Sequence, residues 1–145
     1  MEKLIKEYLE SNIDMQLSTV RDGQPWACTV YYVYDDKFNL YWTSGRSRRH
    51  SVEILNNPKT AVTIVKDVDK KQALQIIGNS YVVENEELEK VHELYQKRYG
   101  VKDYDIVEMK KKDPEGRAYW VFKPNEIYTW DEVNFPKEPK QKFIP

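Results

Sequence analysis

The residues most able to do chemistry in this chain lie together between Tyr41 and His50. Three arginines, two serines and a histidine occur within this short stretch. Their guanidinium and hydroxyl groups donate hydrogen bonds that suit the oxygens of a phosphate group. If a helix begins here, each arginine in its first turn costs roughly 0.3–1 kcal/mol against the helix dipole unless an anion offsets the charge. The segment therefore predicts a phosphate-binding site, and the alternative is a solvated helix face.

The elements that would position this segment are predicted from the residues on either side. Asn39–Thr43 has the aromatic and alternating character of a strand. Val52–Leu55 supplies apolar positions for a helix over residues 48–56, and Pro58 follows its end. A strand, a glycine-containing turn and a helix start form a recurrent phosphate-binding arrangement. His50 lies in this region and either contacts the phosphate or has only a capping or surface role.

Hydrophobic periodicity predicts two further helices. Apolar residues recur at helical spacing over residues 1–11 and again over residues 84–99, where Gly100 ends the pattern. Residues 101–112 are ambiguous between a loop and a short helix. The segment 135–145 contains three prolines and is expected to be an extended tail that packs on a partner or stays loose.

Alternating and aromatic runs predict six or seven short strands. The pair Asp22-Gly23 is typical of a tight hairpin, and Gly78 inside an apolar run indicates a bulge or bend. We expect the first three strands to form a meander and the last two to be separated by a bend at 123–125. The strands are predicted at 16–20, 26–34, 39–43, 60–65, 73–83, 119–122 and 126–130.

This pattern favours a mainly β fold of one domain over residues 1–145. Short strands with few residues between neighbours are typical of a closed or nearly closed antiparallel barrel, here flanked by helices. A barrel of this size fills its interior with side chains. A nucleotide-sized ligand would therefore lie outside the barrel, against a helix or a second subunit.

The composition excludes several classes of protein. The 23 basic and 24 acidic residues leave a formal net charge of −1, which gives no general signal for a nucleic-acid or membrane partner. No apolar stretch approaches the ~18 residues of a membrane-spanning helix, and the start does not resemble a signal peptide. Cys28 is the single cysteine and cannot form an internal disulfide, so we expect a cytoplasmic protein. There is no metal-ligand spacing and no nucleophile or nucleotide-binding motif, so redox chemistry would require a borrowed cofactor.

Between Met15 and Val83 the chain resembles the FMN-binding split-barrel proteins related to pyridoxamine 5′-phosphate oxidase. The order and spacing of several segments carry this resemblance. It implies a six- to seven-stranded antiparallel split barrel that binds FMN at the interface of a homodimer. The segments are the Asp22-Gly23 hairpin, the strand Ala27–Val33, the turn Asp35-Asp36, the strand end Tyr41-Trp42-Thr43, the triplet Ser47-Arg48-Arg49, the helix end Asn57-Pro58 and the strand with Gly78.

The resemblance also implies roles for individual residues. The triplet would bind the FMN phosphate, and residues of the second and third strands would lie along the ring system. Gln75 would make a polar contact with the flavin or be a solvated strand residue. Strand tryptophans such as Trp26, Trp120 and Trp130 would flank the ring or pack in the core. The implied cofactor-binding residues are Cys28, Thr29, Val30, Trp42, Thr43, Ser47, Arg48, Arg49 and Gln75.

Two departures from the oxidase concern its substrate. The oxidase has an arginine and a lysine at the ends of its second strand, where this chain has Ala27 and Tyr32. The segment 135–145 also lacks the tryptophan and arginine residues with which the oxidase grips its phosphorylated substrate. We therefore expect an FMN-dependent oxidoreductase that acts on another small molecule. A non-catalytic flavin store or sensor, and a split barrel that binds deazaflavin or haem, are the alternatives.

Overall fold

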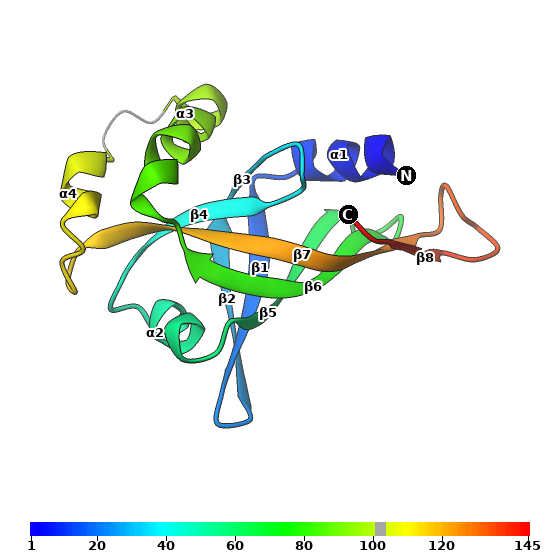
Figure 1. Cartoon of the computed structure of the whole chain (residues 1–145). Helices are drawn as coiled ribbons and strands as arrows, with labels where there is room; N and C mark the ends of the chain where they lie inside the picture. The colour runs from blue at the N-terminus through cyan, green and yellow to red at the C-terminus, as the bar shows by residue number, and fades with distance from the viewer. Residues whose placement is uncertain (101–103) are drawn as a thin grey trace.

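Eight strands form one antiparallel sheet that curls into a split barrel, with helices at its ends (Figure 1). The computed structural model describes residues 1–100 and 104–145. Seven strands follow the order β2-β1-β5-β6-β7-β4-β3, and β8 pairs with β7. The elements are α1 (Glu2–Glu10), β1 (Asp14–Arg21), β2 (Gln24–Tyr31), β3 (Val33–Tyr34), β4 (Leu40–Gly45), α2 (Arg49–Asn56), β5 (Lys59–Asp67), β6 (Gln72–Val82), the 3-10 turn η1 (Asn85–Glu87), α3 (Leu88–Tyr99), α4 (Ile106–Lys110), β7 (Arg117–Asp131) and β8 (Lys140–Phe143).

The predicted pairings of the first three strands are present, but the prediction that 26–34 forms one continuous strand is wrong. The run 26–34 divides at Tyr32 into β2, which pairs with β1, and β3, which pairs with β4 at the opposite end of the sheet. Tyr32 is completely buried, and its hydroxyl donates a hydrogen bond of 2.7 Å to the Leu9 carbonyl. The buried ring therefore takes the chain out of one strand and into another, and β2 is left as an edge strand facing the split.

The bulge predicted at Gly78 is confirmed, but the predicted break in the following strand is wrong. The pairing of β6 with β7 shifts register between Ile77 and Gly78. Pro124 lies opposite Gly78, so the irregularity is absorbed there and β7 continues as one strand. A Cβ atom at Gly78 would lie 2.2 Å from the Lys123 carbonyl oxygen, which explains why glycine is needed at this crossing.

The C-terminal segment packs on its own chain. Residues 140–143 form β8 against β7, and the Phe143 ring meets Phe38 edge-on at 5.7 Å. The short helix left open by the sequence is present as α4, whereas residues 101–103 of that ambiguous segment lie outside the described residues. Among the helices of the described ranges, none is long and apolar enough to cross a membrane.

Two hydrophobic clusters explain which surfaces are covered. One fills the barrel interior around Trp42, Trp120 and Phe122. The other lies outside the barrel, where α3 and α4 cover the outer face of β4 and the start of β7 around Tyr119. These helices therefore cover only one end of the sheet (Figure 1).

The outer face of β1, β2, β5 and the first half of β6 has no such cover within the described residues, and we call it the open face. Strand alternation and pairing register place every second side chain outward, exposed or half-buried. By the same register, the charged residues Asp14 and Lys59 lie at the ends of this face. The uncharged residues at its centre are Gln16, Ser18, Val20, Pro25, Ala27, Thr29, Ala61, Thr63, Val65, Ala73, Gln75 and Ile77.

Candidate functional site

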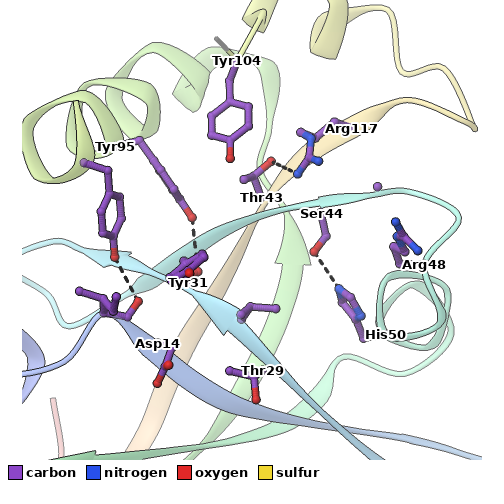
Figure 2. A pocket seen from close by; sticks show the side chains of 14 residues that line it. Asp14, Thr29, Tyr31, Thr43, Ser44, Arg48, His50, Tyr95, Tyr104 and Arg117 are labelled. Atoms are coloured by element: carbon purple, nitrogen blue, oxygen red, sulfur yellow. Dashed lines mark hydrogen bonds between the residues drawn. The ribbon is translucent and has the colours of Figure 1, made fainter. Parts of the chain in front are cut away.

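A cavity of about 830 Å³ lies outside the barrel, where the edge strand β2 and the strand β4 face each other beneath α3 (Figure 2). This position agrees with the expectation that a nucleotide-sized ligand would lie outside the barrel. The volume falls in the range of about 300–1,000 Å³ typical of small-molecule and cofactor sites. Its lining consists of Ile13, Asp14, Thr29, Val30, Tyr31, Thr43, Ser44, Gly45, Arg48, His50, Tyr95, Tyr99, Tyr104 and Arg117.

One end of the cavity is suited to an anion. The helix α2 begins after Arg48 without a side-chain cap and without an acidic residue in its first turn. Its first main-chain N–H groups are therefore available to a ligand, and the helix dipole favours negative charge there. The Arg48 side chain packs beside Gly45, where an added Cβ atom would lie 3.6 Å from the Arg48 Cγ atom.

His50 adds a neutral polar group at the same end. Its Nε2 atom lies 2.8 Å from the Ser44 hydroxyl oxygen. Burial, reinforced by the positive charge of Arg48, lowers the pKa of the His50 imidazole below its usual value. The ring is therefore neutral near pH 7, and Arg48 supplies the formal charge at this end.

Tyrosines form the opposite wall of the cavity. Tyr95 and Tyr99 belong to α3, and their ring centroids are 5.6 Å apart. Tyr31 belongs to β2, and its ring centroid lies 6.3 Å from that of Tyr99. Tyr104 stands edge-on to Tyr95 at 6.0 Å. Burial raises the pKa of the Tyr95 hydroxyl well above its usual range, so it stays protonated. The wall offers flat apolar surface with neutral hydroxyl groups.

Arg98 fixes α3 above the cavity. Its guanidinium donates a hydrogen bond of 2.9 Å to the Leu9 carbonyl and further hydrogen bonds to the carbonyls of Asn12 and Tyr32. These acceptors lie where α1 ends and where β2 gives way to β3. The tyrosine wall is therefore anchored to the barrel by an arginine that is fully engaged with the protein.

Four of the nine predicted cofactor-binding residues line this cavity, namely Thr29, Val30, Thr43 and Arg48. Ser47 is exposed just before the start of α2, and Gln75 lies on the open face. Neither Ser47 nor Gln75 lines the cavity, and their predicted contacts with a flavin stay predictions.

Cys28 and Trp42 lie on the inner side of their strands. Trp42 is completely buried in the barrel core. Cys28 packs against that core, and burial together with the nearby negative charge of Glu53 raises the pKa of its thiol. Their side chains do not line the cavity, so any contact with a ligand on the outer side would have to involve their main chain.

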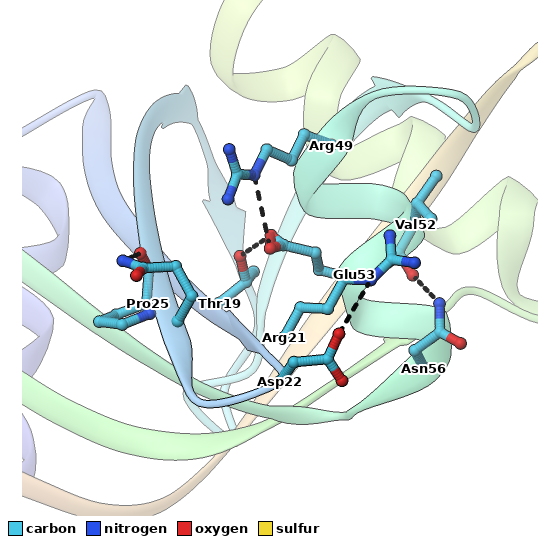
Figure 3. Close-up of polar contacts among 9 residues, drawn as sticks. Thr19, Arg21, Asp22, Pro25, Arg49, Val52, Glu53 and Asn56 are labelled. Carbon is cyan, nitrogen blue, oxygen red and sulfur yellow. Dashed lines mark hydrogen bonds and ion pairs between the residues drawn. The ribbon is translucent and has the colours of Figure 1, made fainter.

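Arg49 is directed away from the cavity, into a separate hollow (Figure 3). Its Nε atom lies 3.5 Å from a carboxylate oxygen of Glu53, whose side chain is only 2% exposed. The Glu53 carboxylate also accepts a hydrogen bond of 3.0 Å from the Thr19 hydroxyl. The Arg49 guanidinium stacks 4.0 Å from the Trp26 ring centre. The Glu53 carboxylate thus offsets the positive charge of Arg49, the first residue of α2.

The structure adds lining residues that the sequence analysis did not select. Tyr95 was placed on the apolar face of its helix, and that position was the available signal for its role. No sequence pattern pointed to Arg117 as a lining residue, because Arg117 reaches the cavity only through the pairing of β4 with β7, which places it opposite Gly45. Within the described residues there is no cluster of three or more His, Cys, Asp or Glu side chains that could hold a metal ion.

Comparisons with known proteins agree with this architecture. The UPF0306 protein of Pasteurella multocida is 29% identical over 103 residues, which cover 68% of this chain and 69% of the relative. A Listeria innocua structure assigned to pyridoxamine 5′-phosphate oxidase has 24% identity and a TM-score of 0.70, covering 88% of this chain and 96% of that one.

Two more distant structures share the fold and bind different cofactors. A Nostoc punctiforme FMN-binding protein related to pyridoxamine 5′-phosphate oxidase has 14% identity and a TM-score of 0.67, covering 97% of this chain and 86% of that one. A Mycobacterium smegmatis haem-binding protein has 15% identity and a TM-score of 0.77, covering 99% of this chain and 57% of that one. The family model described as pyridoxamine 5′-phosphate oxidase matches residues 1–131. The chain therefore belongs to the pyridoxamine 5′-phosphate oxidase family.

Proposed function

We propose that this protein binds FMN in the cavity between β2 and β4 and acts as a flavin-dependent oxidoreductase on a small molecule. The observation that carries the proposal is that one cavity joins an anion-binding end, formed by Arg48 and the start of α2, to a wall of tyrosines. A phosphate ester on a flat aromatic ring system has the matching chemistry. Family membership and the FMN-binding relative from Nostoc support the choice of flavin.

The edge strand β2 also fits a flavin. It pairs only with β1, so main-chain groups on the side facing the split have no ladder partner. Thr29 and Val30 lie on this part of β2 and line the cavity. Because successive residues of an antiparallel strand direct their main-chain groups to opposite sides, one of these two residues presents a free N–H and C=O to the cavity. These groups are suited to the polar edge of an isoalloxazine ring, which both donates and accepts hydrogen bonds.

Each part of the site has a task in this proposal. Arg48 and the α2 N–H groups bind the phosphate, the β2 main chain and Thr43 orient the ring, and the tyrosine wall limits access of water. When bound, FMN supplies the hydride or electron chemistry, for which this chain has no motif of its own.

We further propose that two copies of the chain form a homodimer through the open face. Stable interfaces are depleted in charged residues at their centre. The centre of the open face carries no charged residue, and Asp14 and Lys59 lie at its ends. Its Ile77 side chain is 47% exposed. The open face reaches the cavity at Thr29, so a second copy seated there would border the cofactor and help to enclose it.

Haem is the alternative favoured by a specific observation, since the Mycobacterium smegmatis haem-binding protein has the same fold. The absorbance spectrum of the purified protein separates the possibilities. FMN gives bands in the near ultraviolet and blue, haem a strong Soret band, and deazaflavin a single band nearer the violet. The released ligand should then be identified by mass. A Soret band, or no ligand and no binding of added FMN, would reject the flavin proposal.

Turnover separates an oxidoreductase from a flavin store. Rapid mixing of the oxidised holoprotein with NADH or NADPH should bleach the blue flavin band, because hydride transfer requires mainly that the nicotinamide can lie beside the ring. Pyridoxamine 5′-phosphate should not be oxidised at a useful rate. An FMN-loaded protein that neither nicotinamide bleaches would favour the store or sensor.

A further inference from the structure

Arg117 brings a second positive charge to the cavity, directed along β4 to Thr43 and not to the start of α2. It lies opposite Gly45 at the start of β7, and its side chain turns along β4 toward Thr43. Its Nη1 atom donates a hydrogen bond of 3.4 Å to the Thr43 hydroxyl oxygen, and its guanidinium stacks 5.3 Å from the Tyr104 ring centre. Figure 2 shows Arg117 beside Tyr104 and Thr43, and Arg48 past the end of β4 next to α2.

The Arg117 side chain is exposed at the wall of the cavity. No carboxylate within the described ranges forms an ion pair with it, whereas Arg49 is paired with Glu53. Arg98, the other arginine near the tyrosines, is engaged by main-chain carbonyls. The acidic lining residue, Asp14, is opposite Tyr31 on β1 and lies across the cavity from Arg117 (Figure 2). An exposed guanidinium on a cavity wall is suited to an anion supplied by a ligand.

Tyr104 gives this charge a flat neighbour. Its ring stands edge-on to Tyr95 at 6.0 Å and to Tyr119 at 6.1 Å, with interplanar angles of 86° and 85°. Two edge-on contacts orient the ring, and the ring in turn supports the guanidinium. The Arg117 guanidinium can donate two parallel hydrogen bonds to an anionic group, and the Tyr104 ring offers an aromatic surface beside it. Together they are suited to a planar molecule that bears an anionic group.

We infer that Arg117 and Tyr104 form the substrate-recognition site and that the substrate is a small planar molecule with an anionic group. The inference deepens the proposed function by naming the substrate class of the same cavity, and it rests on that proposal for the role of the site. Arg48 and Arg117 have different partners: Arg48 serves the cofactor phosphate, and Arg117 serves the substrate anion above Thr43.

The test uses two probes that have the same shape and differ in charge, benzoate and its neutral isostere benzamide. Each is titrated into the purified protein by calorimetry, and into the FMN-loaded protein with flavin absorbance as a second readout. The variants are Arg117→Gln, which removes the charge, and Arg117→Lys, which keeps the charge without the fork. Arg21→Gln is the matched control, because Arg21 is an exposed arginine outside the cavity. Thermal melting verifies that each variant is folded.

We expect the wild type to prefer benzoate over benzamide by about tenfold or more, the usual value of a charge-assisted hydrogen bond. Arg117→Gln should abolish the preference, Arg117→Lys should retain part of it, and Arg21→Gln should leave it intact. Equal affinity of the wild type for the two probes, or a preference that survives in Arg117→Gln, would overturn the inference.

A separate measurement distinguishes substrate recognition from cofactor binding. The ratio of FMN affinity to riboflavin affinity reports on the phosphate grip alone, and Arg117→Gln should leave this ratio unchanged. A large fall in the ratio would assign Arg117 to the cofactor phosphate and reject it as the substrate site. A wild type that binds no flavin but prefers benzoate through Arg117 would reject the proposed function and retain the anion site.

Discussion

Neighbouring arginines at the start of α2 should respond to substitution in opposite ways. Arg48 faces the cavity, whereas Arg49 faces Glu53 and Trp26. Arg48→Ala should weaken FMN binding by about 10- to 150-fold, since a charge-assisted hydrogen bond contributes about 1.5–3 kcal/mol. Riboflavin has no phosphate, so its affinity should not change. The melting temperature of this variant should stay close to that of the wild type.

Arg49→Ala should act mainly on stability. Removing one partner of a fully buried pair costs about 3–5 kcal/mol, and an exposed pair contributes less than about 1 kcal/mol. Because Arg49 is 51% exposed while Glu53 is 2% exposed, the expected loss lies between these limits. We expect about 2 kcal/mol, with a further 0.5–1 kcal/mol or so from the lost stacking on Trp26. This corresponds to a melting temperature lower by roughly 6–9 °C for a domain of this size.

The two effects are measured on the same preparations. Fluorescence titration with FMN and with riboflavin gives the ratio of affinities, and urea unfolding gives the stability. The double variant Arg49→Ala with Glu53→Gln is the control, because neutralising the carboxylate should recover part of the loss. The reasoning fails if Arg49→Ala leaves unfolding unchanged and lowers the FMN-to-riboflavin ratio as much as Arg48→Ala does.

Three further predictions concern the frame of the site. The buried Asp131 carboxylate accepts hydrogen bonds from the main chain and side chain of Asn134 and from the Tyr8 hydroxyl. Burial alone would raise the pKa of this carboxyl, but the hydrogen bonds outweigh burial and lower the pKa to about 2. Asp131 should therefore contribute about 2 kcal/mol above pH ~4 that is lost as the pH falls toward 2, and urea unfolding of Asp131→Asn should lack this pH-dependent contribution. Ile77→Arg places a charge on the open face, and light scattering should show a folded monomer where the wild type is a dimer; an unchanged dimer would exclude this interface. Gly78→Ala should cost more than about 2 kcal/mol in urea unfolding, because its Cβ atom would meet a strand carbonyl at 2.2 Å, and wild-type stability would show that the crossing can relax.

Local sequence signals predicted the elements that depend on nearby residues. The Asp22-Gly23 turn joins β1 to β2, and the arginine-rich segment leads into α2 within one residue of the predicted start. The bulge at Gly78 also follows from a local signal, a glycine within a strand. These features depend on turn geometry, helix capping and hydrophobic periodicity, all of which act over a few residues. The predicted antiparallel barrel and phosphate-binding segment rested on this level of information, whereas the split form of the barrel was implied by the family resemblance.

Tertiary structure decided which side chains reach the cavity. Cys28 and Trp42 point into the barrel and Thr29 and Thr43 point out, because strand pairing determines which face of each strand is buried. The pairing of β4 with β7 brings Arg117 to the cavity, opposite Gly45, although the two residues are 72 positions apart in the sequence. Arg49 faces Glu53 because the two lie one helical turn apart, beside the Thr19 hydroxyl of β1. A sequence specifies the residue types available for a site, but side-chain direction depends on register and on long-range packing, which only the folded chain establishes.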